Sequence, residues 1–233
     1  MIVDARPALA MGFAGRFEAA ARDAIAAHGR FACAVPGGSV ARTFLPALAG
    51  ATVEWPRVDV FWGDERAVPP DDPSSNYGLA RRLWLDHVPL DPRRVHRIHG
   101  EEHDLEAAAG AYARELTRVL EGRPLDLVLL GMGPDGHVCS LFPGHRALDE
   151  SARTVVAIDD SPKPPPKRIT LTLVSLAKAA LVCVAAFGAT KALAAREALE
   201  SSASRLPVAL AARAGERALF LLDADAASLL APG

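Results

Sequence analysis

The chain has 233 residues, half of them hydrophobic, with 26 basic and 28 acidic residues and a formal net charge of −2. This near balance gives no general attraction to nucleic acid or to acidic membranes, so any affinity for anions must come from a local site. No apolar run reaches the roughly 18 residues of a spanning helix and no signal peptide is evident, while the scattered cysteines favour a reduced, cytoplasmic protein.

The start of the chain predicts a helix, a strand and a second helix. Helical spacing of apolar residues indicates a helix over 8–28, and the run 31–35 reads as a buried strand. The segment 36–39, PGGS, follows directly and precedes a predicted helix over 40–48. A glycine pair and a hydroxyl between a strand and a helix start are typical of a phosphate cradle, because backbone N–H groups and the helix dipole face the anion. An ordinary strand-to-helix turn is the alternative.

A second strand, predicted over 58–62, leads into three charged side chains, Asp64, Glu65 and Arg66. Parallel strands would bring these side chains to the same edge of the sheet as the other strand ends. The polar loop 69–75 that follows is of the kind that often covers a site. Asn76 is predicted to cap a helix that runs to residue 86.

The segment 95–103 contains three histidines near two glutamates. A short strand is predicted over 95–98, and a helix over 104–120 follows the segment. His96, His99 and His103 superficially suggest metal ligands, but their spacing matches no zinc pattern. A solvated loop is therefore the favoured interpretation, and no metal is predicted.

The most informative stretch is 125–144, LDLVLLGMGPDGHVCSLFPG. The apolar run 125–130 predicts a strand buried on both faces. The glycines that follow indicate a tight loop at the strand's carboxyl end, where open α/β sheets place ligands. Asp135 and His137 lie in this loop, and an acid–base pair on a rigid loop indicates a catalytic site. A plain glycine turn with a satisfied histidine is the alternative.

The residues 131–136 also fit the dinucleotide fingerprint G-x-G-x-x-G, with Asp159 at roughly the distance of a ribose contact. That fingerprint needs a helix starting at the third glycine, whereas Pro143 and Gly144 end any helix after about two turns. Pro134 and His137 would also crowd the pyrophosphate. We therefore expect no dinucleotide, and no other cofactor.

The last third continues the alternation. The proline run 161–167 cannot join a regular sheet. The other elements expected here are a strand over 169–173 after Arg168, a short helix capped by Ser175, a strand over 180–187, a helix over 192–199, a strand over 217–222 and a helix over 223–230. The expected fold is α/β: one doubly wound, mostly parallel sheet with helices on both faces, in a single domain over residues 1–233.

Four strand ends are thus expected at one edge. The backbone of Gly37 and Gly38, with Ser39, Arg168 and Lys191, would form a pocket for one phosphate group. A bound anion would also compensate Lys191, whose charge opposes the helix dipole; a lysine pointing into water is the alternative. His137, with Asp135 and Asp64, would be the reacting end. Because no G-x-S-x-G elbow is present, the histidine is predicted to activate water.

Five motifs resemble those of the 6-phosphogluconolactonase/glucosamine-6-phosphate isomerase family. They are PGGS at 36–39, FWGDERAVPPDDPSSNYGLA at 61–80, LLGMGPDGHVCSLFPG at 129–144, PKPPPKRITLT at 162–172 and GATKA at 188–192. The resemblance implies a sugar-phosphate isomerase-like, modified Rossmann fold and hydrolysis of 6-phosphoglucono-δ-lactone, a step of the oxidative pentose phosphate pathway. His137 would be the general base, Asp135 would orient it, and Arg66 would stabilise either the oxyanion or the phosphate. Asn76 and Gly133 complete the predicted substrate-binding set.

The resemblance also bears on partners and alternatives. A small sugar-phosphate lactone is the only expected partner, without nucleic acid or membrane, and the chain is expected to be a monomer or weak homodimer. Deamination of glucosamine 6-phosphate, for which Asp64 matches a strand-end aspartate, ranks second. A non-catalytic sugar-phosphate sensor ranks third, since residues 1–30 leave no room for a DNA-binding motif. Val40 and Ala41 replace a usual threonine and proline, which predicts weaker binding, and Cys139 near the site predicts sensitivity to oxidation.

Overall fold

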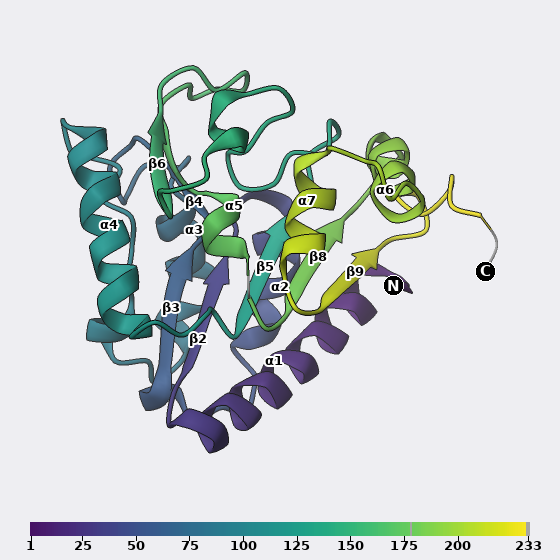
Figure 1. Cartoon of the computed structure of the whole chain (residues 1–233). Coiled ribbons are helices and arrows are strands. Elements are labelled where there is room, and N and C mark those ends of the chain that lie inside the picture. The colour runs from purple at the N-terminus through teal and green to yellow at the C-terminus, as the bar shows by residue number, and fades with distance from the viewer. Residues whose placement is uncertain (178, 232–233) are drawn as a thin grey trace.

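The computed structural model describes residues 1–177 and 179–231, and a six-stranded parallel sheet lies at its centre (Figure 1). The strand order is β1-β9-β8-β5-β2-β3, and every neighbouring pair is parallel. The strands are β1 (Ile2–Val3), β2 (Phe31–Val35), β3 (Val58–Trp62), β5 (Leu127–Gly131), β8 (Val182–Ala186) and β9 (Ala218–Leu222). Because all six run the same way, their carboxyl ends meet at one edge, which confirms the predicted mostly parallel fold.

Helices cover both faces of this sheet. In Figure 1, α7 lies in front of β8 and α2 lies behind the strands. The α-helices are α1 (Arg6–His28), α2 (Gly38–Leu48), α3 (Asn76–Leu83), α4 (Leu105–Leu120), α5 (Leu173–Leu176), α6 (Ala192–Glu200) and α7 (Pro207–Ala214). Short 3-10 helices occupy Trp55–Arg57, Leu85–His87, Pro92–Arg94, Arg146–Asp149 and Ala189–Lys191.

The core between α1, α2 and the sheet is largely aromatic. The ring of Phe17 packs edge-on against Phe31 at 5.0 Å and against Trp84 at 5.9 Å between centroids. The ring of Phe13 packs edge-on against Phe44, at 5.1 Å between centroids. Such edge-to-face pairs add to the stabilisation that comes from burying the rings. The helical spacing of these residues in α1 therefore corresponds to its buried face, as predicted.

A second, three-stranded sheet lies beside the first and was not predicted. Its order is β4 (Asp64–Arg66), β7 (Arg168–Leu171) and β6 (Val155–Ile158), with antiparallel neighbours. The backbone N–H of Leu171 donates to the carbonyl of Gly63 at 2.9 Å, where the chain passes from β3 into β4. Asp64, Arg66 and Arg168 thus belong to one sheet, and the loops of β2, β5 and β8 belong to the other.

Several local predictions need correction. Ser75, and not Asn76, caps α3, because its hydroxyl accepts from the N–H of Gly78 at 3.0 Å. The predicted strand over 95–98 is a single bridge between Val60 and Val95. Residues 223–230 form turns instead of a helix, and Ser175 lies inside α5 instead of capping it. The short strand β1 and helix α7 were not predicted, and one domain over 1–233 stays a prediction.

The first strand, β1, lies beside the last strand, β9, at one edge of the large sheet. Arg6, the first residue of α1, donates two hydrogen bonds to Asp223 after β9, at 3.0 and 2.9 Å. Asp223 also accepts from the N–H of Gly188 at 2.9 Å, in the loop that leads to Lys191. Within residues 1–177 and 179–231, no helix is both long and apolar enough to cross a membrane.

Candidate active site

The loop after β5 folds back on itself at the carboxyl edge of the large sheet. The N–H of Gly133 donates to the carbonyl of His137 at 2.8 Å, and Gly136 adopts a positive φ of 78°. A Cβ on Gly133 would lie only 1.9 Å from Nδ1 of His137. Gly133 is itself buried and leaves room for the imidazole, and its predicted substrate contact stays a prediction.

His137 and Asp135 form a close pair in this loop. Nδ1 of His137 lies 2.5 Å from a carboxylate oxygen of Asp135, and the imidazole packs against the ring of Phe142 at 4.7 Å between centroids. Burial lowers the pKa of His137 although the neighbouring carboxylate opposes that shift. For Asp135, burial raises the pKa, but the hydrogen bond and charge of His137, a backbone hydrogen bond and the Lys163 charge together outweigh burial and the net shift is downward. Nε2 of the imidazole has no partner among the described residues.

Asp64 was predicted near His137, but its hydrogen bonds lead elsewhere. Its buried carboxylate accepts from the hydroxyl of Ser140 at 2.6 Å and from the amide of Asn76 at 3.1 Å. Asn76 is 1% exposed and donates a second bond to the carbonyl of Asp64 at 2.9 Å. These contacts tie β4 to α3 and to the loop after β5. The side chain of Asn76 is enclosed by protein, and its predicted substrate contact stays a prediction.

Arg168 is buried as well, with 4% of its surface exposed. Its guanidinium donates to the backbone carbonyls of Lys163 at 2.9 Å, Pro164 at 3.2 Å and Pro165 at 3.0 Å. A further group, Nη1, lies 3.8 Å from the Asp64 carboxylate. This guanidinium thus holds the proline segment in place, and the predicted contact between Arg168 and a phosphate stays a prediction.

Three other groups at this edge remain available to an anion. Gly38 and Ser39 are exposed at the start of α2, where no side chain caps the helix and the first N–H groups lack helical partners. Lys191 is half-buried, and burial together with the nearby Lys163 lowers its pKa. Arg66 donates to the carbonyl of Ser74 at 2.6 Å, and its buried Nε has no hydrogen-bond partner among the described residues.

Sequence reasoning missed Lys163 and Ser140 at this site and expected Glu65 at the sheet edge without giving it a role. Lys163 places its ammonium 3.2 Å from Nδ1 of His137 and 3.4 Å from Asp135. Ser140 links Asp64 to the loop after β5, and Glu65 accepts from the N–H groups of Asn76 and Tyr77 at the start of α3. A lysine in a proline-rich surface segment gives no sequence signal that distinguishes it from a solvated one.

No activated side-chain nucleophile is found near His137. The hydroxyl of Ser140 is buried and donates to Asp64, and burial raises the pKa of the Cys139 thiol well above its usual value. A suppressed thiolate is also a poor target for oxidation, so the predicted oxidation sensitivity of Cys139 does not fit this environment.

The two alternative ligand sites suggested by the sequence differ from this one in their backbone or in their place in the fold. No helix starts at Gly136, and Asp159 follows β6 in the small sheet, exposed and paired with Arg146 at 3.1 Å. The argument against a dinucleotide fingerprint therefore agrees with the backbone. Among the described residues, no group of three or more His, Cys, Asp or Glu side chains has an arrangement that could hold a metal ion.

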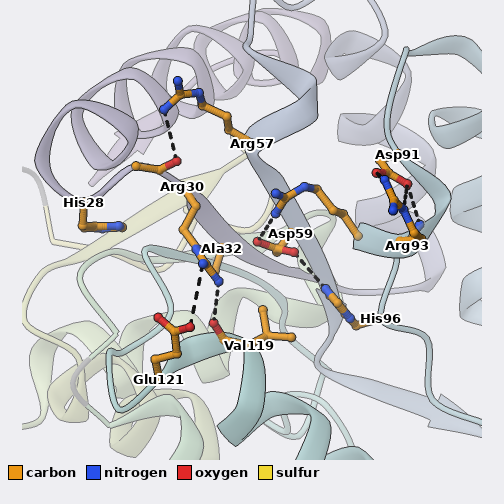
Figure 2. A network of polar contacts seen from close by, with 12 residues as sticks. His28, Arg30, Ala32, Arg57, Asp59, Asp91, Arg93, His96, Val119 and Glu121 are labelled. Atoms are coloured by element: carbon orange, nitrogen blue, oxygen red, sulfur yellow. Dashed lines mark hydrogen bonds and ion pairs between the residues drawn. The ribbon is translucent and has the colours of Figure 1, made fainter.

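His96, expected in a solvated loop, is instead buried between two carboxylates. Nε2 lies 2.9 Å from Asp59 (Figure 2). Nδ1 lies 2.8 Å from Glu115, and Arg94 contacts the other Asp59 oxygen at 2.9 Å. Both ring nitrogens thus face carboxyl oxygens, and His96 is held from two sides. Cavities of about 890 Å³ and 390 Å³ flank His96, and the loops of the His137 site line neither of them.

With this geometry established, comparison with known proteins identifies the class. A family model described as "Glucosamine-6-phosphate isomerases/6-phosphogluconolactonase" matches residues 4–220. The chain belongs to this family, which confirms the resemblance drawn from its motifs.

The relatives include both 6-phosphogluconolactonases and a glucosamine-6-phosphate deaminase. A curated 6-phosphogluconolactonase from Streptomyces coelicolor is 43% identical over 222 residues, covering 89% of this chain and 85% of its own. A solved 6-phosphogluconolactonase from Trypanosoma cruzi superposes with a TM-score of 0.86 at 26% identity, covering 99% and 96% of the two chains. A monomeric glucosamine-6-phosphate deaminase reaches a TM-score of 0.77 at 24% identity, covering 98% of each chain, which is a likeness of fold alone.

Proposed function

We propose that this protein hydrolyses 6-phospho-D-glucono-1,5-lactone to 6-phospho-D-gluconate. Its family and its curated relatives make it a lactone hydrolase. The observation that carries the proposal is the His137–Asp135 pair, in which the carboxylate lies 2.5 Å from Nδ1 and leaves Nε2 without a partner among the described residues. This is the arrangement of a base with its orienting group.

In the proposed reaction, His137 takes a proton from water through Nε2 as the water oxygen bonds to the lactone carbonyl carbon. The carbonyl oxygen gains the negative charge. When the tetrahedral intermediate collapses, the bond to the ring oxygen breaks and that oxygen receives the proton from the imidazolium. The new carboxylic acid then ionises, so that each turnover releases one proton. Asp135 holds the imidazole in the Nδ1–H form throughout.

The phosphate would bind at the start of α2, to the N–H groups of Gly38 and Ser39, with Lys191 as its cation. Exposed glycine and serine N–H groups at a helix start support this assignment, because they combine free donors with the positive end of the helix dipole. Arg66, partly exposed beside the Ser74 carbonyl, contributes a further positive charge near this edge for an anionic substrate or the oxyanion. Arg168 is left out of this set because its donors are engaged with backbone carbonyls.

The test is proton release after freshly generated 6-phosphogluconolactone is added, measured against the buffer rate and against unphosphorylated gluconolactone. Acceleration confined to the phosphorylated lactone would support both the reaction and the phosphate site. Equal acceleration of both lactones would contradict the phosphate site. If neither is accelerated, ammonia release from glucosamine 6-phosphate tests the deaminase alternative, which the shared fold alone supports.

A further inference from the structure

Lys163 lies against the proposed catalytic pair although it comes from a different part of the chain. Its ammonium is 3.2 Å from Nδ1 of His137 and 3.4 Å from the Asp135 oxygen that the same Nδ1 contacts. Lys163 and His137 therefore contact the same carboxylate oxygen of Asp135. Neither the family's name nor those of its relatives assigns anything to this lysine.

The position of Lys163 is built into the fold. Arg168 donates to the carbonyls of Lys163 and Pro164, and the hydroxyl of Ser161 bonds to both the N–H and the carbonyl of Lys163, at 3.2 and 2.9 Å. The backbone is thus held at the N–H and the carbonyl of Lys163 and at the carbonyl of Pro164. Its side chain is 37% exposed and reaches back to the loop after β5. The buried guanidinium of Arg168 accounts for the placement, since it satisfies carbonyls that the prolines leave outside any sheet.

The distances decide where the protons lie. An oxygen and a nitrogen only 2.5 Å apart need a proton between them, so Nδ1 of His137 carries a hydrogen that points to Asp135. An ammonium group can only donate, and Nδ1–H has no lone pair to receive it. The hydrogen bond of Lys163 must therefore go to Asp135, and its contact with the imidazole is one of charge.

We propose that Lys163 is a positioning residue that keeps the imidazole of His137 neutral while Asp135 holds its Nδ1–H form, so that Nε2 is the basic atom. A cation 3.2 Å from Nδ1 opposes a second positive charge on the ring. One carboxylate, Asp135, faces two potential cations and cannot neutralise both. This inference rests on the proposed function where it concerns catalysis, whereas the protonation of His137 is a property of the protein itself.

The other charged groups around the ring act in the same setting. Asp135 and the more distant Asp64 favour the imidazolium, and burial and Lys163 oppose it. Lys191, from the loop after β8, adds positive charge near Lys163 and Asp135. Phe142 covers the ring with an uncharged face. Removal of the Lys163 charge leaves two carboxylates facing the imidazole, which predicts easier protonation of His137.

The test compares Lys163→Met and Lys163→Arg with Lys167→Met, a matched control at an exposed lysine of the same segment. Titration of His137 by NMR is expected to move upward by about half to one pH unit in Lys163→Met. Lys163→Arg and Lys167→Met should stay near the wild-type value. Nitrogen-15 shifts of the wild type should show Nδ1 protonated and Nε2 free at neutral pH.

Kinetics gives an independent readout. The acidic limb of kcat/KM against pH, corrected for spontaneous hydrolysis, should move upward with the NMR titration in Lys163→Met and be restored in Lys163→Arg. An unchanged titration in a folded Lys163→Met variant, or a wild-type Nδ1 without a proton, would overturn the inference. If no lactone is hydrolysed at all, the proposed function fails while the NMR titration still decides the relation between Lys163 and His137.

Discussion

The amide oxygen of Asn76 occupies the space that a side chain on Gly37 would need. A Cβ built on Gly37 would lie 1.7 Å from this oxygen, which is buried and has no hydrogen-bond partner among the described residues. The first glycine of the loop after β2 is therefore in direct contact with α3. Because the Asn76 amide also bonds to Asp64, the contact joins the proposed phosphate loop to the small sheet.

Gly37→Ala is expected to destabilise the protein by about 2 kcal/mol or more, because overpacking at an enclosed contact forces the backbone apart. Substrate binding should weaken as well, because the start of α2 moves. Urea unfolding and KM for the phosphorylated lactone measure the two effects. Gly15→Ala, on α1 with open space around it, is the control and should be close to neutral. In an Asn76→Ala background the added cost of Gly37→Ala should be much smaller, and an equal cost would contradict the contact.

His137→Ala should lower kcat by about 10²- to 10⁴-fold while the fold is retained, since a positioned general base contributes that much. Asp135→Asn should also lower kcat, because an amide can donate to Nδ1 and favour the wrong tautomer. Circular dichroism and stopped-flow proton release provide the measurements. A His137→Ala variant within tenfold of the wild type would rule out the general-base assignment.

Lys191→Ala is expected to raise KM far more than it lowers kcat, because the lysine is assigned to the non-reacting phosphate. The same substitution at Arg196, an exposed cation on α6, serves as the control and should leave both constants near wild type. Unphosphorylated gluconolactone should not distinguish Lys191→Ala from the wild type. A large fall in kcat at unchanged KM would instead assign Lys191 to the chemical step.

His96→Leu should destabilise the protein by about 3 kcal/mol, because removal of the imidazole leaves the buried Asp59 carboxyl group without one of its partners. Both Asp59 and His96 have side chains less than a tenth exposed, at 3% and 4%. His99→Ala, at a histidine with 55% of its side chain exposed, should change stability little. Thermal or urea unfolding measures the difference, and kcat should be unchanged in both variants. A His96→Leu variant with unchanged unfolding free energy would mean that the contacts of His96 with the two carboxyl groups do not stabilise the fold.

Asp223→Asn tests stability against pH. Burial raises the pKa of Asp223, but hydrogen bonds from Gly188 and Ala226 and the pair with Arg6 outweigh it, so the folded-state pKa is lowered. The carboxylate therefore stabilises the fold above its unfolded pKa of about 3.9, and this stability is lost as pH falls through the folded value. At pH 7 the variant should be less stable by about 1–2 kcal/mol.

Urea unfolding of wild type and Asp223→Asn between pH 7 and pH 3 measures this dependence. The difference in unfolding free energy should shrink toward zero in the acidic range. Asp225→Asn, at an exposed neighbour, should show no such trend. A difference that stays constant with pH would mean that the Asp223 charge is not the stabilising group.

The large sheet was predictable because its strands carry their own signal. The strands at 31–35 and 58–62 are apolar runs bounded by turn residues, and the structure has them at the predicted bounds. The small sheet was not predictable, because β4 consists of three charged residues and pairs with β7, about a hundred residues further along the chain. A strand was predicted over 169–173, where β7 lies, but its sequence does not show that β4 is its partner.

Contacts between distant segments of the chain also limited the prediction of the site. Parallel strands brought the four loops to one edge, and His137 with Asp135 was found from adjacent residues. The sequence did not show that Arg168 would bind the backbone carbonyls of the proline segment while Lys163 reaches His137. That is a tertiary contact, and residue type alone favours arginine for anion binding.

The link from Arg6 through Asp223 to Gly188 has a practical consequence for engineering the protein. It places the beginning of α1 two contacts away from the loop that presents Lys191. Deletion of residues 1–6 would remove β1 and this guanidinium together, so we expect shortened versions to lose substrate affinity as well as stability. Affinity tags and fusion partners are therefore better attached ahead of residue 1 than substituted for the first residues.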